Sequence, residues 1–435
     1  MKKTLPLFLI LFLIYWGCEV EPEEVLTAST ELTLWGEVYS VENTDTIYLN
    51  IIGLKGPMPP EIGNLTNLTY LNLGGNQLTG EIPPEIGNLT NLTYLNLGGN
   101  QLTGEIPPEI GNLTNLTYLN LGGNQFTGEI PSQIGNLTNL TYLNFGSNQL
   151  TGIPPEIGDL TNLTYLNLVS NQLTGPIPSM IENLTNLTYL GLNDNQITGG
   201  IPPEIGNLTN LTSLNLGNNQ LTREIPPEIG NLTNLTRLVL YENQFTREIP
   251  PEIGNLTNLT YLNLRDNQFL GLIPSEIGSL TNLNRMFLYN NQLIGSIPPE
   301  ISNLTNLTEL DLENNHFSGL IPSEISNLIN LTKLILNDNQ LTGVIPESIC
   351  NLIEINCLIN ITNNQLCPPY PSCVEDYVGE QDTSNCEDFV ELWGEYYSIE
   401  NTTELDLGVS GLTGEIPPEI GNLTNLERLY LHQNQ

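Results

Sequence analysis

The amino-acid sequence predicts an α/β solenoid in which short parallel strands line a concave face, extended or 3-10 limbs return the chain, and true helices are few. Three observations support this prediction. The segment Asn-Leu-Thr-Asn-Leu at residues 64–68 recurs, with small changes, down to position 351, and every step but one is 24 residues. Apolar and polar residues alternate after each copy, and a Pro-Pro pair closes most units. Periods of 20–50 residues are typical of stacked-repeat proteins.

Residues 1–18 are predicted to be an export signal that takes no part in the fold. Lys2 and Lys3 precede an apolar run over residues 5–16. Twelve helical residues rise about 18 Å, which is too short for a hydrocarbon core of about 30 Å. The run ends in Gly-Cys and resembles a bacterial lipoprotein signal, which implies that Cys18 is lipidated. An ordinary secretory signal is the alternative. Both interpretations predict that the chain is exported. A lipidated Cys18 would in addition hold it at the cell surface or outer membrane through a lipid anchor only.

Residues 19–45 are expected to form an acidic lead and an N-terminal cap, in which Trp35 covers the apolar edge of the first coil. The repeat array then occupies residues 46–350. Stacked units bury a continuous core that no single unit can close, and their outermost coils need capping. Parallel strands about 4.8 Å apart would give a sheet on the order of 60 Å long.

The alternation of apolar and polar residues within each unit predicts which side chains face the core. Leu71 and Leu73 alternate with Tyr70 and Asn72, so the two Leu side chains should point inward and the other two outward. Asn76 follows where the chain turns inward, and its amide can satisfy turn backbone groups that no strand ladder reaches. The Pro pair at 83 and 84 excludes further strand pairing or a long helix on the return limb.

The second half of the unit, Leu-Thr-Gly-Glu-Ile-Pro at residues 78–83, resembles the plant-type leucine-rich repeat of 24 residues. The resemblance covers about 300 residues. It implies a horseshoe whose concave sheet serves recognition. Plant relatives usually carry a paired-cysteine cap at the N-terminus, and this sequence does not.

The repeat decays after residue 350 into a segment predicted to be a Cys-rich C-terminal cap over residues 351–388. In an exported protein these cysteines are expected to form disulfides, with zinc as the less favoured alternative. Five is an odd number, so one thiol can remain free, and the pairing does not follow from the sequence. The candidates are Cys350, Cys357, Cys367, Cys373 and Cys386.

A second array is predicted to begin at residue 389. Residues 392–402 repeat the block at 34–44 with a constant offset of 358, and Leu405 and Leu407 follow in register. The sequence reaches Gln435 with a coil half built, which led us to expect a fragment of a longer tandem-array protein, with a frayed terminus as the alternative.

Composition excludes several functions. The chain carries 48 Asp and Glu against 10 Lys and Arg, a formal net charge of −38, so a nucleic acid would meet a surface of its own sign. His316 and His432 lie in different arrays, and no nucleophile elbow, zinc-protease or phosphate-loop motif occurs. We therefore expect neither an enzyme nor a protein with a cofactor or metal.

The outward columns of the strands point to a binding site. The column of Tyr70 repeats Tyr through position 189 and then varies, and the column of Asn72 behaves similarly. Tyr and Arg dominate binding hot spots. Drift among solvated surface positions is the plain alternative. The candidate partner-binding residues are Arg237, Tyr241, Tyr261, Arg265, Arg285, Phe287, Tyr289, Glu309, Asp311 and Lys333.

These observations predict a cell-surface protein that binds an extracellular protein, or a surface glycan, through its concave sheet. One alternative is a structural spacer or adhesin stalk, which the near-perfect repetition over residues 64–168 favours. Another is polysaccharide binding on the Tyr row, which can equally be a structural row of aromatic cross-strand pairs.

Overall fold

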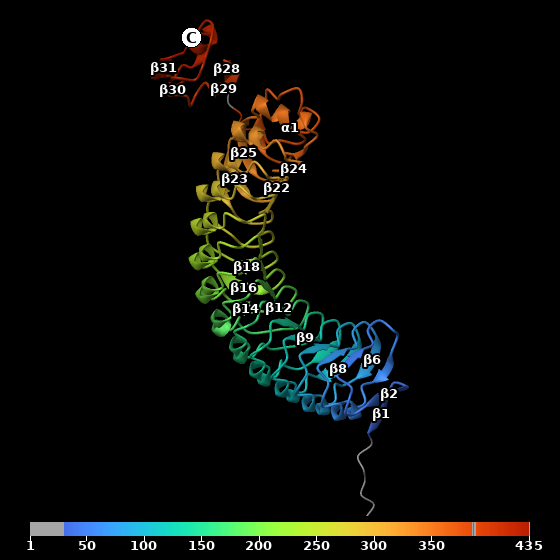
Figure 1. Cartoon of the computed structure of the whole chain (residues 1–435). Coiled ribbons are helices and arrows are strands. Elements are labelled where there is room, and N and C mark those ends of the chain that lie inside the picture. The colour runs from blue at the N-terminus through green and yellow to red at the C-terminus, as the bar shows by residue number, and fades with distance from the viewer. Residues whose placement is uncertain (1–29, 385, 387–388, 435) are drawn as a thin grey trace, which may run out of the picture.

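The computed structural model describes residues 30–384, 386 and 389–434, and it shows a curved solenoid (Figure 1). Fourteen parallel strands, one from each coil, form one long sheet, and the short 3-10 helices follow the outer edge of the arc. Described residues include a single α-helix, α1 (Cys350–Glu354). The predicted α/β solenoid with few true helices is therefore confirmed.

The strands of the long sheet are three residues each and pair in register. They are β3 (Thr46–Tyr48), β5 (Tyr70–Asn72), β7 (Tyr94–Asn96), β9 (Tyr118–Asn120), β11 (Tyr142–Asn144), β12 (Tyr165–Asn167), β13 (Tyr189–Gly191), β15 (Ser213–Asn215), β17 (Arg237–Val239), β19 (Tyr261–Asn263), β20 (Arg285–Phe287), β22 (Glu309–Asp311), β24 (Lys333–Ile335) and β26 (Leu358–Asn360).

Alternation along each strand decides what enters the core. Leu71 and Leu73 are fully buried, as predicted, and the equivalent apolar residues of every later coil join the same hydrophobic cluster. The second outward column departs from the prediction on several coils. Asn72, Asn263 and Asp311 are buried, whereas Asn96 and Asn120 are half-buried. Asn72 is 6% exposed, and its Nδ2 lies 3.5 Å from the Tyr70 hydroxyl.

A ladder of buried Asn residues satisfies the turn backbone, as predicted. Asn100 donates from Nδ2 to the Leu97 carbonyl at 2.9 Å and to the Leu73 carbonyl of the preceding coil at 3.0 Å. Its Oδ1 accepts the Leu78 N–H at 3.0 Å. One side chain thus supplies partners for three buried backbone groups and links two coils. The same pattern recurs through Asn339.

After the turn, further strands of two to five residues form separate small sheets beside the long one. They are β4 (Lys55–Pro57), β6 (Gln77–Gly80), β8 (Gln101–Glu105) and β10 (Gln125–Thr127); β14 (Thr198–Gly199), β16 (Gln220–Arg223) and β18 (Gln244–Phe245); and β21 (Ile294–Gly295), β23 (His316–Gly319), β25 (Gln340–Val344) and β27 (Gln365–Cys367).

A 3-10 turn then closes each coil, because Pro fixes φ at its start and cannot donate to a ladder. The turns are η1 (Pro60–Asn64), η2 (Pro84–Asn88), η3 (Pro108–Asn112), η4 (Ser132–Asn136), η5 (Pro155–Asp159), η6 (Ser179–Asn183), η7 (Pro203–Asn207), η8 (Pro227–Asn231), η9 (Pro251–Asn255), η10 (Ser275–Ser279), η11 (Pro299–Asn303), η12 (Ser323–Asn327) and η13 (Glu347–Ile349).

Different devices cover the two ends of this stack. At the N-terminal end the antiparallel hairpin of β1 (Glu31–Leu34) and β2 (Glu37–Ser40) places Leu34 in the core, with half-buried Trp35 packed against it. At the C-terminal end, disulfides join Cys350 to Cys373 and Cys367 to Cys386. Disulfide formation is therefore shown rather than zinc binding, and Cys357, one of the five candidates, is instead a buried free thiol.

Residues 389–434 form a separate small unit. It contains β28 (Phe389–Leu392), β29 (Glu395–Ser398), β30 (Glu404–Asp406), η14 (Pro418–Asn422) and β31 (Arg428–Tyr430). Its own core holds Val390, Leu392, Leu405 and Leu423. No helix within the described residues has the length and apolar character needed to cross a membrane. Cys18 and the predicted signal lie outside the described residues.

Candidate functional site

Five successive strands of the long sheet bring the predicted binding residues together. In β17, β19, β20, β22 and β24 the first outward positions pair in register, in the order Arg237, Tyr261, Arg285, Glu309 and Lys333. Six of the ten Lys and Arg residues of the chain fall between positions 223 and 333. This strongly acidic protein therefore concentrates its positive charge on the coils that carry the predicted site.

We call the predicted binding residues on and beside β17 to β24 the concave cluster. Tyr261 is the centre of one half of it. The Arg237 guanidinium carbon lies 3.9 Å from the centre of the Tyr261 ring, and the Phe287 ring meets Tyr261 edge to face at 5.7 Å. Arg285 Nε lies 3.0 Å from Glu309 Oε1. Cation–π contacts and aromatic pairs of this kind hold side chains in fixed positions. The cluster therefore presents a mixed cationic and aromatic surface that is already ordered.

Arg265 is the centre of the other half. Its guanidinium carbon lies 4.4 Å from the Tyr241 ring centre and 5.6 Å from that of Tyr289. Its Nη2 forms an ion pair with Glu242 Oε1 at 2.9 Å. Asp266 contacts it from the opposite side. Burial raises the pKa of both Tyr241 and Tyr289, so the two phenols remain neutral donors at ordinary pH.

Two acids that hold Arg265 in place were absent from the predicted site. Glu242 and Asp266 directly follow Tyr241 and Arg265, where earlier coils carry Gly75 or Gly99. The replacement of Gly by an acid beside each aromatic or Arg residue was the signal in the sequence that could have identified them.

Asp311 does not fit the role predicted for it. Its side chain is 4% exposed, which leaves little of it for a partner to touch. Burial raises the pKa of this carboxyl, whereas the Glu313 N–H and the Lys333 ammonium, which lies 3.2 Å from Oδ2, favour its charged form. Asp311 thus positions Lys333 from beneath the surface.

The Tyr ladder of the N-terminal coils is a continuous stack. Neighbouring ring centres from Tyr70 to Tyr189 lie 4.3–4.5 Å apart, with planes within 5–10° of parallel. Burial raises the pKa of Tyr118, and it raises that of Tyr165 to about 12. Each inner ring has both faces covered by its neighbours, so the stack has few free aromatic faces for sugar rings.

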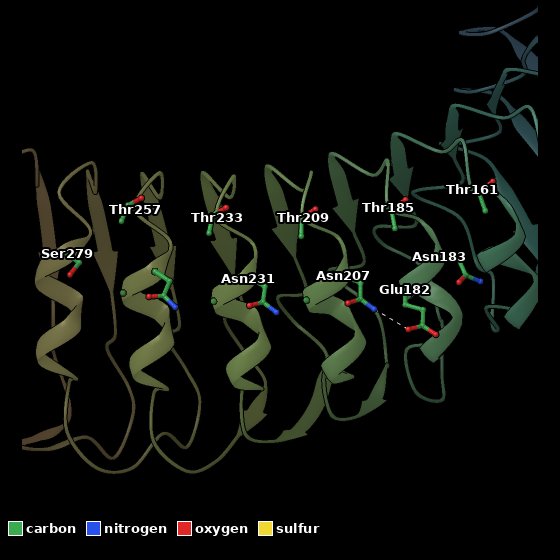
Figure 2. A pocket seen from close by; sticks show the side chains of 14 residues that line it. Thr161, Glu182, Asn183, Thr185, Asn207, Thr209, Asn231, Thr233, Thr257 and Ser279 are labelled. Carbon is green, nitrogen blue, oxygen red and sulfur yellow. Dashed lines mark hydrogen bonds between the residues drawn. The ribbon is translucent and has the colours of Figure 1, made fainter.

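A long groove of about 1360 Å³ follows the 3-10 turns on the side of the coils (Figure 2). One row of Thr residues, such as Thr209 and Thr233, and one row of Asn residues, such as Asn207 and Asn231, line it. The Gly residues between the rows are required by packing, because a Cβ on Gly206 would lie 2.7 Å from the Glu228 carbonyl oxygen. This groove is therefore the periodic gap between stacked turns.

No cluster of three or more His, Cys, Asp or Glu side chains placed to hold a metal ion occurs in the described part of the chain. The site offers ordered cations, aromatic faces and flanking acids, which suit recognition of a protein surface. The fold defines the class of protein, a solenoid built from stacked repeats.

The chain belongs to the leucine-rich repeat family. The leucine-rich repeat region model matches residues 59–173, 108–190 and 240–367, and two further leucine-rich repeat models match residues 185–229 and 209–269. No curated protein matches this chain.

Solved structures with similar folds come from plants and bacteria. The plant peptide hormone receptor RGFR1 in complex with RGF2 is 37% identical with a TM-score of 0.75, and the match covers 90% of this chain and 63% of the receptor chain. A leucine-rich repeat protein of Leptospira interrogans is 35% identical with a TM-score of 0.61, covering 91% of this chain and 86% of that one. An internalin, inlF, from Listeria monocytogenes is 27% identical with a TM-score of 0.60, covering 80% and 89%. This chain thus spans less than two thirds of the receptor's length.

Proposed function

We propose that this chain is an exported cell-surface protein that recognises an extracellular protein partner through the concave cluster on β17 to β24. The observation that carries the proposal is the arrangement around Arg265, where two Tyr rings and two acids hold one cation at the sheet surface. Preorganised Arg and Tyr residues lose little conformational freedom on binding, which favours affinity. The similarity to a receptor solved with its peptide hormone supports the same function.

The proposal includes membrane attachment by a lipid on Cys18, with the signal over residues 1–18, the cap over 19–45, the array over 46–350, the Cys-rich cap over 351–388 and a second array from 389. Membrane fractionation of cells that produce the full chain tests the anchor. Cys18→Ser should move the protein from the membrane fraction to the medium or the soluble exported fraction. Retention of the variant on the membrane would contradict lipid anchoring.

A binding experiment tests the site itself. The chain from residue 19 onward is screened against extracellular proteins and glycans of the producing organism, and the affinity for the protein that binds is then measured. Tyr241→Ala, Arg265→Ala, Arg285→Ala and Phe287→Ala should each weaken binding by roughly 1 to 3 kcal/mol, because they remove exposed or half-buried surface anchors rather than core residues.

Tyr118→Ala in the Tyr ladder is the control, since it truncates a side chain at the repeat position of Arg285 on a coil outside the cluster. Its affinity for the partner should equal that of the wild type. A folded quadruple variant that retains wild-type affinity would favour the alternative that the repeats are a spacer or adhesin stalk. Capture of a polysaccharide that Tyr118→Ala abolishes would favour the glycan alternative.

A further inference from the structure

On the small sheet formed by β14, β16 and β18, two adjacent coils carry Arg at a position where neighbouring coils carry Gly. At or just after the end of the second strand of the coil, neighbouring coils carry Gly in the left-handed region, with φ of 81° at Gly199 and 73° at Gly271. Arg223 and Arg247 occupy this position with φ of 72° and 70°. A residue with a Cβ is disfavoured in this conformation, so both arginines are held against a local preference. Backbone strain of this kind tends to mark functional positions.

The two guanidinium groups lack ionic partners. Neither Arg223 nor Arg247 forms an ion pair with any residue that the structure describes, whereas Arg265, Arg285 and Lys333 all do. Both side chains are exposed and line a shallow hollow of about 490 Å³ with Gln244, Gln268 and neighbouring residues. Glu224 also borders this hollow, and Glu248 follows Arg247 in sequence.

Exposed aliphatic side chains continue from the two arginines on the following coils. Leu270 is 43% exposed, Leu272 57%, Ile294 48% and Leu320 59%, and these are four of the six exposed large apolar side chains between residues 58 and 345. Near the N-terminal end of the array the corresponding positions carry Thr103 and Glu105.

Backbone hydrogen bonds show that this row is continuous. The Thr246 N–H donates to the Arg223 carbonyl at 2.7 Å, and the Leu270 N–H donates to the Arg247 carbonyl at 2.8 Å. The Ile294 N–H in turn donates to the Gly271 carbonyl at 2.8 Å. The arginines and the aliphatic residues thus lie on successive coils of one surface, which is separate from the long sheet.

We propose that this lateral strip, formed by Arg223, Arg247, Leu270, Leu272, Ile294 and Leu320, is a second docking surface, for a protein segment that presents carboxylates followed by aliphatic side chains. Unpaired guanidinium groups suit carboxylates, which they can bind with two hydrogen bonds. The adjoining aliphatic row favours a protein over an acidic polysaccharide, because a polysaccharide has no aliphatic side chains to bury there. An anionic membrane is disfavoured by the net charge of −38.

Residues found at the same positions of other coils were chosen for variants that should fold. Arg223→Gly with Arg247→Gly restores the residue that nearby coils use, so thermal stability should be unchanged or higher. Leu272→Ser with Leu320→Ser follows the precedent of Ser296, which occupies the same position of the coil between them. The probe is a fluorescent synthetic peptide with four Glu followed by alternating Val and Leu, and its binding to the exported chain is measured by anisotropy.

The probe should bind, and each double variant should weaken its binding by roughly tenfold or more. Peptides with Gln in place of Glu, or with Ser in place of Val and Leu, should bind at least about tenfold more weakly. Tyr241→Ala on the concave cluster is the control that should leave probe binding unchanged, so failure here is distinguishable from failure of the proposed concave site.

Three results would overturn the proposal. The first is no binding of the probe up to about 1 mM, a weak limit for recognition. The second is equal binding of the Ser-containing peptide, which would indicate a plain anion site. The third is the finding that the double variants change only self-association or attachment to anionic phosphatidylglycerol vesicles, which would assign the strip to a second copy of the chain or to a lipid surface.

Discussion

Coils in the two halves of the array share one core and differ on their surface. From residue 64 to 190 the outward positions repeat Tyr and Asn, and the Tyr rings stack on one another. From residue 213 to 338 the same positions vary and include Arg237, Arg285 and Phe287, which take part in cation–π, ion-pair and aromatic contacts. Since the inward apolar positions and the buried Asn ladder continue through both halves, the fold does not require this change. The partner-binding site that we propose lies on the half whose surface varies.

The largest expected effect tests whether the two halves share one core. Asn124→Ala and Asn291→Ala each remove the partners of three buried backbone groups, for example the Leu97 and Leu121 carbonyls and the Leu102 N–H. Each buried group left unsatisfied costs about 1–3 kcal/mol, so with three such groups either variant should lose at least roughly 3 kcal/mol of unfolding free energy.

The two variants should lose the same unfolding free energy, and denaturant titration of both tests this. Asn115→Ala is the control, because Asn115 is exposed and makes one bond, to the Thr90 carbonyl. It should cost less than about 1 kcal/mol. A loss at Asn124 much larger than at Asn291 would show that the halves differ in their cores as well as on their surfaces.

Loss of a disulfide in the C-terminal cap should destabilise only the C-terminal end of the array. Cys350→Ser with Cys373→Ser, or Cys367→Ser with Cys386→Ser, should each destabilise the protein by about 2–4 kcal/mol. Because each coil contacts only its neighbours, hydrogen exchange should accelerate on the C-terminal coils and remain unchanged near the Tyr ladder. Uniform acceleration would contradict this local dependence.

Alkylation provides a companion measurement. Burial raises the pKa of Cys357 to about 11, so in the chain from residue 19 onward this thiol should be unreactive in the native state and become the one labelled cysteine of the five after denaturation without reductant. Labelling of all five cysteines would show that the bridges do not form.

Alkaline pH should act through the Tyr ladder. In the folded state burial raises the pKa of four ladder phenols, Tyr94, Tyr118, Tyr165 and Tyr189, and it reaches about 12 at Tyr165, whereas an unfolded Tyr ionises near about 10. Folding therefore favours the neutral form. This contribution to stability is complete below pH about 10 and is lost as the pH rises from about 10 toward 12. Thermal melts across this interval should show a falling melting temperature.

The variant Tyr118→Phe with Tyr165→Phe keeps the stacked rings and removes two ionising groups. Its melting temperature should fall less than that of the wild type over the same interval. An identical fall in the two proteins would mean that groups outside the ladder control alkaline unfolding.

Salt should have the smallest effect. Glu85, Glu109 and their equivalents repeat at one exposed or half-buried position of successive coils, and like charges about 5 Å apart repel by under about 1 kcal/mol in water. Melts in about 10, 100 and 500 mM sodium chloride should show a modest rise in melting temperature, since salt at 0.1 M shortens the screening length to about 10 Å. A flat or falling melting temperature would show that the rows are too widely spaced to matter.

Most of the fold was predictable because one unit is repeated. Inward Leu71 and Leu73, the Asn76 ladder and the Pro-initiated turns all follow from local alternation and turn chemistry, and repetition multiplies each signal. The burial of Asn72 and Asp311 was not predictable, because it depends on side-chain contacts, such as those with the Tyr70 hydroxyl and the Lys333 ammonium, that alternation along the chain does not specify.

The sequence by itself determined the solenoid, its register and the coils on which the surface changes, since these depend on spacing along the chain. Only the tertiary structure decided which side chains meet across coils. It paired Cys350 with Cys373, left Cys357 free, placed Arg265 between Tyr241 and Tyr289, and aligned Arg223 and Arg247 with the aliphatic row. These contacts join residues that are about one repeat apart, and side-chain direction and backbone conformation fix them, which spacing alone does not specify.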